Sequence, residues 1–320
     1  MESNRIDVIG DVHGHVDKLE RLLHKMGYTQ MSGRWSHRDR IAVFVGDLID
    51  RGPHQLDTVA LVRNMVDTGA ARIVMGNHEF NAIAWHTKHP SVPGAYLRTR
   101  DGERGERHRR QHIRFLEEVG QDSTLHEETI SWFKTIPLWI DHGSSRFVHA
   151  CWDNASIARM SGILTAEHTL TEESLLEATT KGTVVYDDVE LLLKGPEVKL
   201  PTGFAYIDKD GNQRHKARFA WWSSSGATYR SATVIPAGAL TPDGLRHPGM
   251  PDTAIENPPV AGYGDPVPLF VGHYWRTGTP ELLSEYVSCV DYSAGKGGPL
   301  AAYRFDGEWT LSPSKFVMQM

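Results

Sequence analysis

The chain has 320 residues and a net charge of −6, from 34 basic and 40 acidic side chains. Its 40% hydrophobic and 23% charged content is typical of a globular protein with a large core, which argues against a membrane protein and against wholesale disorder. The small negative charge gives no general attraction to nucleic acid or to anionic membranes. Two cysteines, and an N-terminus without the apolar core of a signal peptide, favour a cytoplasmic and reducing location.

The first part of the chain alternates short β-rich runs with segments of helical periodicity. The β-rich runs cover residues 5–9, 40–45 and 71–75, and apolar residues recur at helical spacing over 16–26 and 56–66, with GNHEFNAIAW opening a third helix. This order predicts a sheet covered by helices, with parallel pairing at least in this part. The motifs GDVHG, GDLIDRGP and GNHE each begin within a residue or two of the end of a predicted strand. Because ligands gather at the carboxyl ends of such strands, we expect all three motifs at one edge.

The rest of the chain is less regular. The arginine-rich stretch 98–114 also contains acids, so we interpret it as a solvated helix with internal ion pairs rather than an RNA-binding stripe. Short β-like runs follow at 138–141 and 146–149. Further strands are expected at 267–271, 286–290 and 300–305. We interpret residues 1–320 as a single domain with an ordered, Pro- and Gly-rich insertion at about 151–265.

Six side chains near the predicted strand ends have the chemistry of metal ligands. Asp11 and His13 are two apart in what we expect to be an extended segment, so their side chains would leave the same face. Asp47 opens the next turn, and its carboxylate has two oxygens with which to bridge two metals. The other candidates are Asn77 in GNHE, His149 in FVHACW and His273 in FVGHYW. Mixed Asp, Asn and His ligands suit Mn, Fe or Zn better than a purely oxygen site for Mg or Ca, with Mn our first choice for activity.

The same motifs supply groups for chemistry on a phosphate. Two ions at roughly 3.5 to 4 Å would clamp a phosphate and generate hydroxide near neutral pH. His78 could then protonate the leaving oxygen as general acid, with Asp50 holding its other ring nitrogen. Arg51 offers a planar fork for two phosphate oxygens. Asn77 and His78 would point in different directions, one toward a metal and the other toward the substrate.

At this point the sequence resembles a known family. GDVHG, GDLIDRGP, GNHE, VHA and GHYW, in this order, are similar to the motifs of calcineurin-like metallophosphoesterases, in the branch of phosphoprotein phosphatases and symmetrical dinucleoside tetraphosphate hydrolases. The resemblance covers roughly residues 5–150 and 267–305. It implies an α/β fold in which two mixed β-sheets pack as a sandwich flanked by helices, in four layers, with a dinuclear metal centre at the sheet edge.

The resemblance also implies roles for single residues. Asp11, His13 and Asp47 resemble the ligands of the first metal. The residues that resemble ligands of the second metal are Asp47, Asn77, His149 and His273. His78 and Asp50 resemble the acid and its partner, and Arg51, Asn77 and His78 the groups that hold the substrate. Broader relatives carry a second histidine in the last motif where this chain has Trp275, which favours the phosphoprotein-phosphatase branch.

The expected function is therefore metal-dependent hydrolysis of phosphomonoesters by attack of metal-bound hydroxide, without a phosphoenzyme. A phosphoprotein is the first expected substrate. The alternative enzyme is a symmetrical dinucleoside polyphosphate hydrolase of the diadenosine tetraphosphate type. A third hypothesis is a non-enzymatic module that binds nucleic acid or a partner through residues 98–114; the intact set of ligands and His78 argues against it.

Overall fold

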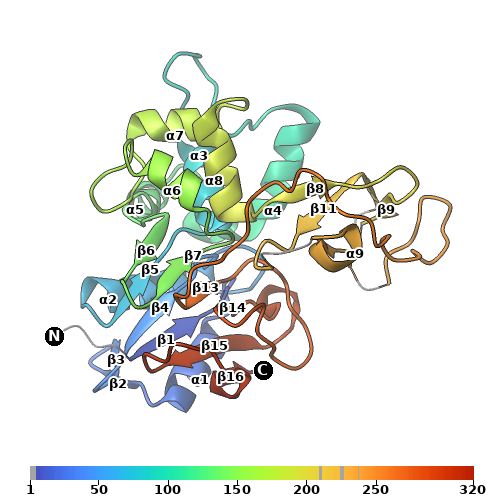
Figure 1. Cartoon of the computed structure of the whole chain (residues 1–320). Coiled ribbons are helices and arrows are strands. Elements are labelled where there is room, and N and C mark those ends of the chain that lie inside the picture. The colour runs from blue at the N-terminus through green and yellow to red at the C-terminus, as the bar shows by residue number, and fades with distance from the viewer. Residues whose placement is uncertain (1–4, 209–210, 224–226, 237) are drawn as a thin grey trace.

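The computed structural model describes residues 5–208, 211–223, 227–236 and 238–320. Two mixed sheets lie at its centre (Figure 1). The first has the strand order β16-β15-β1-β4-β5 and the second β14-β13-β7-β6. The strands of the first sheet are β1 (Ile6–Ile9), β4 (Ile41–Phe44), β5 (Ala71–Ile73), β15 (Leu300–Phe305) and β16 (Phe316–Gln319). Those of the second are β6 (Trp139–Asp141), β7 (Arg146–Val148), β13 (Leu269–Val271) and β14 (Val287–Cys289).

The predicted strands are all present, and their pairing explains the edge on which the motifs meet. β1, β4 and β5 are parallel neighbours, as predicted, whereas β15 and β16 add to β1 in antiparallel register. In the second sheet β14, β13 and β7 are parallel and β6 is antiparallel. The sequence gives no clear sign of β16 or of the hairpin β2 (Thr29–Met31) and β3 (Arg34–Ser36), whose residues are mostly exposed.

The two sheets pack face to face through apolar side chains. Val8 and Val43, paired in the first sheet, lie in one buried cluster with Phe147 and Phe270 of the second. The Phe270 ring contacts Tyr303 of β15 at 5.2 Å between ring centroids, so the contact crosses from one sheet to the other. This confirms the predicted α/β sandwich of two mixed sheets.

Helices cover the outer faces of the sandwich. α1 (Val16–Met26) buries Leu19, Leu22, Leu23 and Met26 at helical spacing, contacts β15 and β16, and ends at Gly27, whose φ of +91° is a left-handed cap. The other helices of the first half are α2 (Gln55–Asp67), α3 (Asn77–His86), α4 (Gly102–Val119) and α5 (Thr124–Phe133). Among the described helices, none combines the length and apolar character that a bilayer-spanning helix needs.

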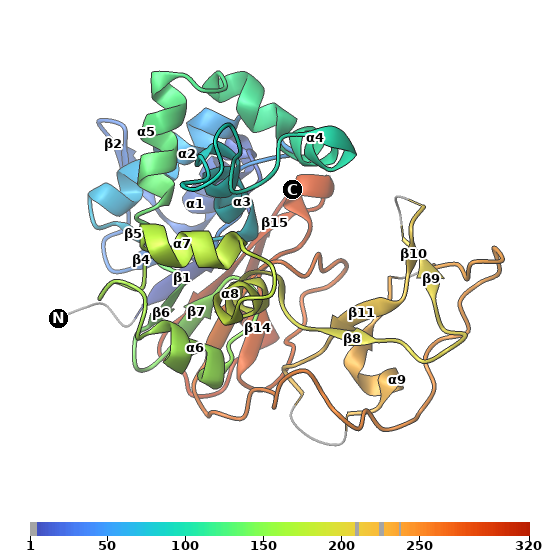
Figure 2. The same ribbon diagram turned by 90° about the horizontal axis from the view of Figure 1, so that it is seen from above.

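The described residues between β7 and β13 form four helices and several short strands. The first three helices are α6 (Asn154–Met160), α7 (Glu172–Thr179) and α8 (Val184–Lys194), and α8 is tied to the second sheet because Ala150 donates its N–H to Leu192 O (2.9 Å). Then follow β8 (Glu197–Lys199), β9 (Tyr206–Ile207), β10 (Gln213–Arg214), β11 (Lys216–Phe219), α9 (Tyr229–Ala232) and β12 (Thr233–Val234). Both views show the part with β8, β9, β11 and α9 projecting to one side of the sandwich (Figures 1 and 2). The boundaries of the predicted insertion, 151–265, stay a prediction.

A buried ion-pair network joins β1 to β15 and to the residue that precedes β4. Asp7 of β1 is fully buried and accepts hydrogen bonds from Arg40 Nε (2.9 Å) and Arg304 Nε (3.1 Å). Arg40 also donates to the carbonyl oxygens of Ile6 and Phe305. Removing one partner of a buried ion pair typically costs about 3–5 kcal/mol.

We therefore expect Arg40→Met to lower the free energy of unfolding by about 3–5 kcal/mol in urea titrations. Arg38→Met is the matched control, because the Arg38 side chain is 92% exposed. A loss for Arg40→Met no greater than that of the control would contradict the role of the network.

A second buried group makes stability depend on pH. His126 of α5 is fully buried, accepts the backbone N–H of Asp122 and packs against His86. Burial, followed by the effect of His86, lowers the pKa of His126 to about 4. The unfolded chain, with an ordinary value near 6.5, then takes up a proton at higher pH than the folded chain.

We expect the wild type to lose stability relative to His126→Gln as pH falls from about 6.5 to about 4, by at most about 3 kcal/mol, and to show no such pH-dependent difference above pH 7. Urea titrations of both proteins at several pH values measure this. Parallel stability curves for the two proteins across that window would rule out His126 as the titrating group.

Candidate metal centre

Polar residues that follow strands of both sheets lie close together at the carboxyl ends of those strands. Asp11 and His13 follow β1, Asp47 follows β4, and Asn77 begins α3 directly after β5. His149 follows β7 and His273 follows β13 in the second sheet. All six of these predicted ligands are buried. The structure thus brings them together at the carboxyl ends of two adjacent sheets.

The turns that carry these residues have an unusual backbone. Several non-glycine residues here have φ between +48° and +76°: His13, Asp47, Asp50, Arg51, His273 and Trp275. Such left-handed residues are uncommon and persist only where the surroundings impose them, typically at functional sites. The expectation that Asp11 and His13 share an extended segment is wrong, because His13 (φ +48°) lies in a turn closed by the hydrogen bond from His15 N–H to Val12 O (3.2 Å).

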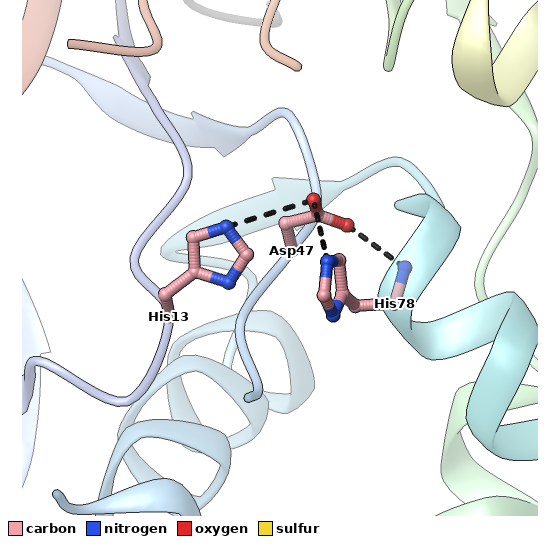
Figure 3. Close-up of side chains that lie close together, drawn as sticks. All are labelled: His13, Asp47 and His78. Atoms are coloured by element: carbon pink, nitrogen blue, oxygen red, sulfur yellow. Dashed lines mark hydrogen bonds and ion pairs between the residues drawn. The ribbon is translucent and has the colours of Figure 1, made fainter. Parts of the chain in front are cut away.

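Asp47 is the central residue of the cluster. Its Oδ2 lies 3.8 Å from His13 Nε2 and 3.8 Å from His78 Nε2, and its Oδ1 accepts the backbone N–H of His78 (2.9 Å; Figure 3). The same Oδ2 lies 3.4 Å from His149 Nε2. Asp47 belongs to two groups of side chains whose spacing suits an ion, one with His13 and His78 and one with His149 and His273. A carboxylate shared in this way can bridge two cations.

The backbone leaves no room for a side chain beside Asp47. A Cβ on Gly76 would lie 2.3 Å from Asp47 Oδ1 and 2.2 Å from its backbone nitrogen. The Glu79 carboxylate binds the turn that carries Asp47: it accepts the backbone N–H groups of Asp47 (2.8 Å), Leu48 (2.8 Å) and Gly76 (3.1 Å). Burial and the neighbouring Asp47 raise the pKa of Glu79 to about 7. Sequence reasoning passed over Glu79, although it stands in the GNHE motif.

The histidines around Asp47 present lone pairs to the centre. His13 Nδ1 donates to Ile49 O (2.8 Å), and His149 Nδ1 donates to Val45 O (2.6 Å), which leaves Nε2 of each ring unprotonated in the neutral form. Nε2 of His13 is buried and has no hydrogen-bond partner among the described residues. Burial, with His78 and Arg51 nearby, lowers the pKa of His13 to about 3, so the ring stays neutral as a metal ligand must.

Asn77 and His273 complete the second group. Asn77 Oδ1 lies 3.1 Å from His149 Nε2 and 2.9 Å from His273 Nδ1, and burial and Arg218 lower the pKa of His273 well below its usual value. Burial disfavours a charge on His149, yet Asp47 and Asp11 raise its pKa to about 10, so the centre attracts positive charge. These donors fit metal ions of the Mn, Fe and Zn type.

Asp11 is buried beside the cluster. It is outside both groups that suit an ion, and its Oδ2 accepts the N–H of His273 (3.1 Å). Asp291 lies nearby, also buried, and its carboxylate accepts the N–H groups of Trp275 (2.7 Å) and Ser293 (2.9 Å). Sequence reasoning missed Asp291; the signal was an acid two residues after the end of the buried strand β14.

His78 and Asp50 form a pair that reaches into α4. Asp50 Oδ2 lies 2.5 Å from His78 Nδ1, and Asp50 Oδ1 lies 2.6 Å from Nδ1 of His112, which is buried. Burial opposes charge on both members, but His112 and His78 hold the pKa of Asp50 far below its usual range, and Asp47 and Asp50 raise the pKa of His78. Asp47 and Asp50 therefore favour the protonated form of His78. The sequence assigns His112 no function; it lies in α4 within the arginine-rich stretch 98–114.

Arg51 lies at the entrance to the cluster. Its Nη2 is 3.3 Å from His78 Nε2, and its guanidinium lies 3.8 Å from the centre of the Trp275 ring. Lys296 contacts the same ring at 3.5 Å. Trp275, which stands where broader relatives have a histidine, thus contacts two cations through its ring.

The centre opens into two clefts. One of about 900 Å³ lies between α6, α8, β8 and β11, and one of about 620 Å³ lies between α3 and α4. Asn77 and Lys194 line both clefts, whereas Arg51 and His78 line the smaller one.

A third group of side chains, formed by His86, Asp122 and His126, also has spacing that suits an ion. Arg100 donates hydrogen bonds to both carboxylate oxygens of Asp122 (3.0 and 3.1 Å), so this carboxylate already has a cationic partner.

Comparison with known proteins gives one family. A family model described as calcineurin-like phosphoesterase matches residues 4–196. Bis(5'-nucleosyl)-tetraphosphatase PrpE [asymmetrical] of Halalkalibacterium halodurans is 49% identical over 75 residues, which are 23% of this chain and 30% of the relative. The relative of the same name from Bacillus subtilis is 31% identical over 149 residues, 45% of this chain and 56% of the relative. The chain therefore spans less than two thirds of these curated relatives.

A solved structure covers more of the chain at lower identity. A protein serine/threonine phosphatase from Saccharomyces cerevisiae aligns with 98% of this chain and 78% of its own, at 14% identity and a TM-score of 0.49. At that score the alignment carries no argument about substrate.

Proposed function

The chain belongs to the calcineurin-like phosphoesterases, and from this premise we propose that it is a metal-dependent phosphatase that hydrolyses phosphomonoesters by direct attack of water, without a phosphoenzyme. The family uses a dinuclear metal centre. The observation that carries the proposal is the position of Asp47, which two separate groups of candidate ligands share.

Each residue has a role in the proposed reaction. Asp11, His13 and Asp47 would hold one metal ion, and Asp47, Asn77, His149 and His273 the other, with Mn as the first choice and Fe or Zn as alternatives. When bound, the ions polarise the phosphoryl oxygens and lower the pKa of water. Arg51 binds two phosphoryl oxygens, and Asn77 helps to hold the substrate.

His78 supplies the proton that the leaving oxygen needs. Asp47 and Asp50 favour its protonated form, and the Asp50 hydrogen bond fixes the ring so that Nε2 faces Asp47 and Arg51. His112 on the far side of Asp50 keeps that carboxylate ionised, so Asp50 remains an acceptor throughout the reaction.

We propose a phosphoprotein as the first substrate class, and a cytoplasmic location for an enzyme whose two cysteines are both free and buried. A second candidate function is hydrolysis of dinucleoside polyphosphates, which the printed names of the relatives favour. The third hypothesis, nucleic-acid or partner binding through residues 98–114, has less support, because Arg98, Arg110 and Arg114 line the cleft beside His78.

The experiment that tests the proposal compares p-nitrophenyl phosphate, a phosphopeptide mixture and diadenosine tetraphosphate at fixed Mn²⁺, with and without chelator. We expect chelator-sensitive turnover of the aryl phosphate. Two ADP from the dinucleotide would indicate symmetrical cleavage, and ATP with AMP asymmetrical cleavage. No turnover of any substrate by protein with bound metal would disprove the enzymatic proposal.

A further inference from the structure

The smaller cleft beside His78 is strongly cationic. Five positive side chains line it, whereas Asp50 is the single carboxylate among its described lining residues. These cations are Arg51, Arg98, Arg110, Arg114 and Lys194. The chain as a whole carries a net charge of −6, so this concentration of positive charge is local.

Arg98 is the most unusual of these cations. It is half-buried, and its guanidinium donates to two neutral acceptors, Asn81 Oδ1 and Gln111 Oε1. No described carboxylate forms an ion pair with it, and burial lowers its pKa to about 10. The acids with most influence on Arg98, Asp50 and Glu190, are already engaged, by two histidines and by Lys194 respectively. A half-buried cation without a counter-charge is costly unless a ligand supplies one.

α4, which lines one side of the cleft, also presents positive charge without a counter-charge in the part of the chain that the structure describes. Residues 98–114 are predicted to form internal ion pairs, but among the described residues the ion pairs of this stretch run outward, from Arg100 to Asp122 and from His112 to Asp50. Arg110 and Arg114 are exposed and line the cleft with Gln111. Their charge is therefore available to a molecule in the cleft.

The position of the cleft tells which part of a substrate it would receive. In the proposed reaction the transferred phosphoryl group lies at Asp47 and Arg51, and the leaving oxygen lies at His78. Both Arg51 and His78 line this cleft and not the larger one, which includes the carboxylates Asp153, Asp187 and Glu197. The leaving group therefore extends into the cationic cleft.

We propose that this cleft is an anion subsite for a leaving group that is itself phosphorylated, with Arg98 as its central cation, so that the preferred scissile bond is a phosphoanhydride. The inference rests on the proposed metal-dependent hydrolysis, and it favours the second candidate substrate class, with a phosphoanhydride bond, over the phosphoprotein proposed first. Water oxygen bonds to the scissile phosphorus, and the bond from phosphorus to the bridging oxygen breaks with its electron pair leaving on that oxygen. His78 protonates the bridging oxygen, and the proton lost by water passes to solvent and restores His78.

The first test is calorimetric binding to the Mn²⁺-loaded full chain of imidodiphosphate, whose P–N–P bridge resists hydrolysis, compared with orthophosphate. We expect imidodiphosphate to bind at least about 10-fold tighter, and Arg98→Gln to remove about 10- to 100-fold of that preference. Arg109→Gln removes the same charge from an exposed position of the same helix outside the cleft lining, and should keep the preference. Equal preference in wild type and Arg98→Gln, or equal loss in both variants, would overturn the inference.

A replacement variant and a second ligand complete the experiment. If circular dichroism shows that Arg98→Gln is unfolded, Arg114→Gln replaces it, because an exposed side chain can be changed without disturbing packing. Tighter binding of adenylyl imidodiphosphate than of imidodiphosphate identifies a nucleotide as the source of the phosphates, and equal binding identifies an inorganic chain. Absence of aryl phosphate hydrolysis would end the proposed function while the binding ratio still decides the subsite.

Discussion

Asp47→Asn is expected to lower turnover of p-nitrophenyl phosphate by about three orders of magnitude or more, and to reduce bound Mn²⁺ from two ions to at most one. The reason is geometric: Asp47 Oδ2 lies within 3.8 Å of His13 and His149, which belong to different ligand groups. An amide oxygen carries no charge with which to hold two cations together.

Metal content by mass spectrometry and steady-state kinetics together measure this effect. Asp57→Asn is the matched control, because it removes a carboxylate that is 75% exposed on α2. Two ions per chain in Asp47→Asn, with activity retained, would show that Asp47 is not the shared ligand.

His78→Asn is expected to lower kcat by about 10²- to 10⁴-fold for an ester with a poor leaving group, such as phenyl phosphate, while metal content stays that of the wild type. The loss should be smaller for p-nitrophenyl phosphate, because its leaving oxygen needs little help from an acid. His78 contacts Asp50 and faces Asp47, so it is placed to give a proton at the centre.

The comparison of two leaving groups separates an acid from a residue that only holds the site together. His215→Asn serves as control, since His215 is exposed on the chain between β10 and β11. An equal loss for both esters, or loss of metal from His78→Asn, would assign His78 a structural or ligand role instead.

The sequence predicts the strand ends and therefore the neighbourhood of the site. Short apolar runs followed by Gly-Asp or Gly-Asn are local signals, and parallel strands bring their ends to one edge. That is why Asp47, Asn77, His149 and His273 could be placed together without coordinates. The strands of the second sheet, three residues each, also coincide with predicted β-like runs, but only the family resemblance implied that they form a second sheet.

What the sequence could not supply depends on contacts between distant segments. His112 reads as one more polar residue of an arginine-rich helix, and only the packing of α4 against α2 buries it against Asp50. Asp291 likewise acquires meaning from Trp275, whose N–H it accepts across the last turn. The left-handed φ of His13 is fixed by hydrogen bonds to the turn of Asp47, so a single strand pattern could not reveal it.

The pairing of β1 with β15 means that the first sheet can be completed only after nearly the whole chain has been synthesised. The N–H of His273 reaches the carboxylate of Asp11, 262 positions earlier, and Ile6 of β1 pairs with Phe305 of β15. Such contacts between distant parts of a chain form slowly, since a long loop must close before they stabilise the fold. Asp11, His13 and Asp47 are therefore synthesised long before His273. The complete centre could bind its metals only after His273 has been synthesised and the distant segments have paired.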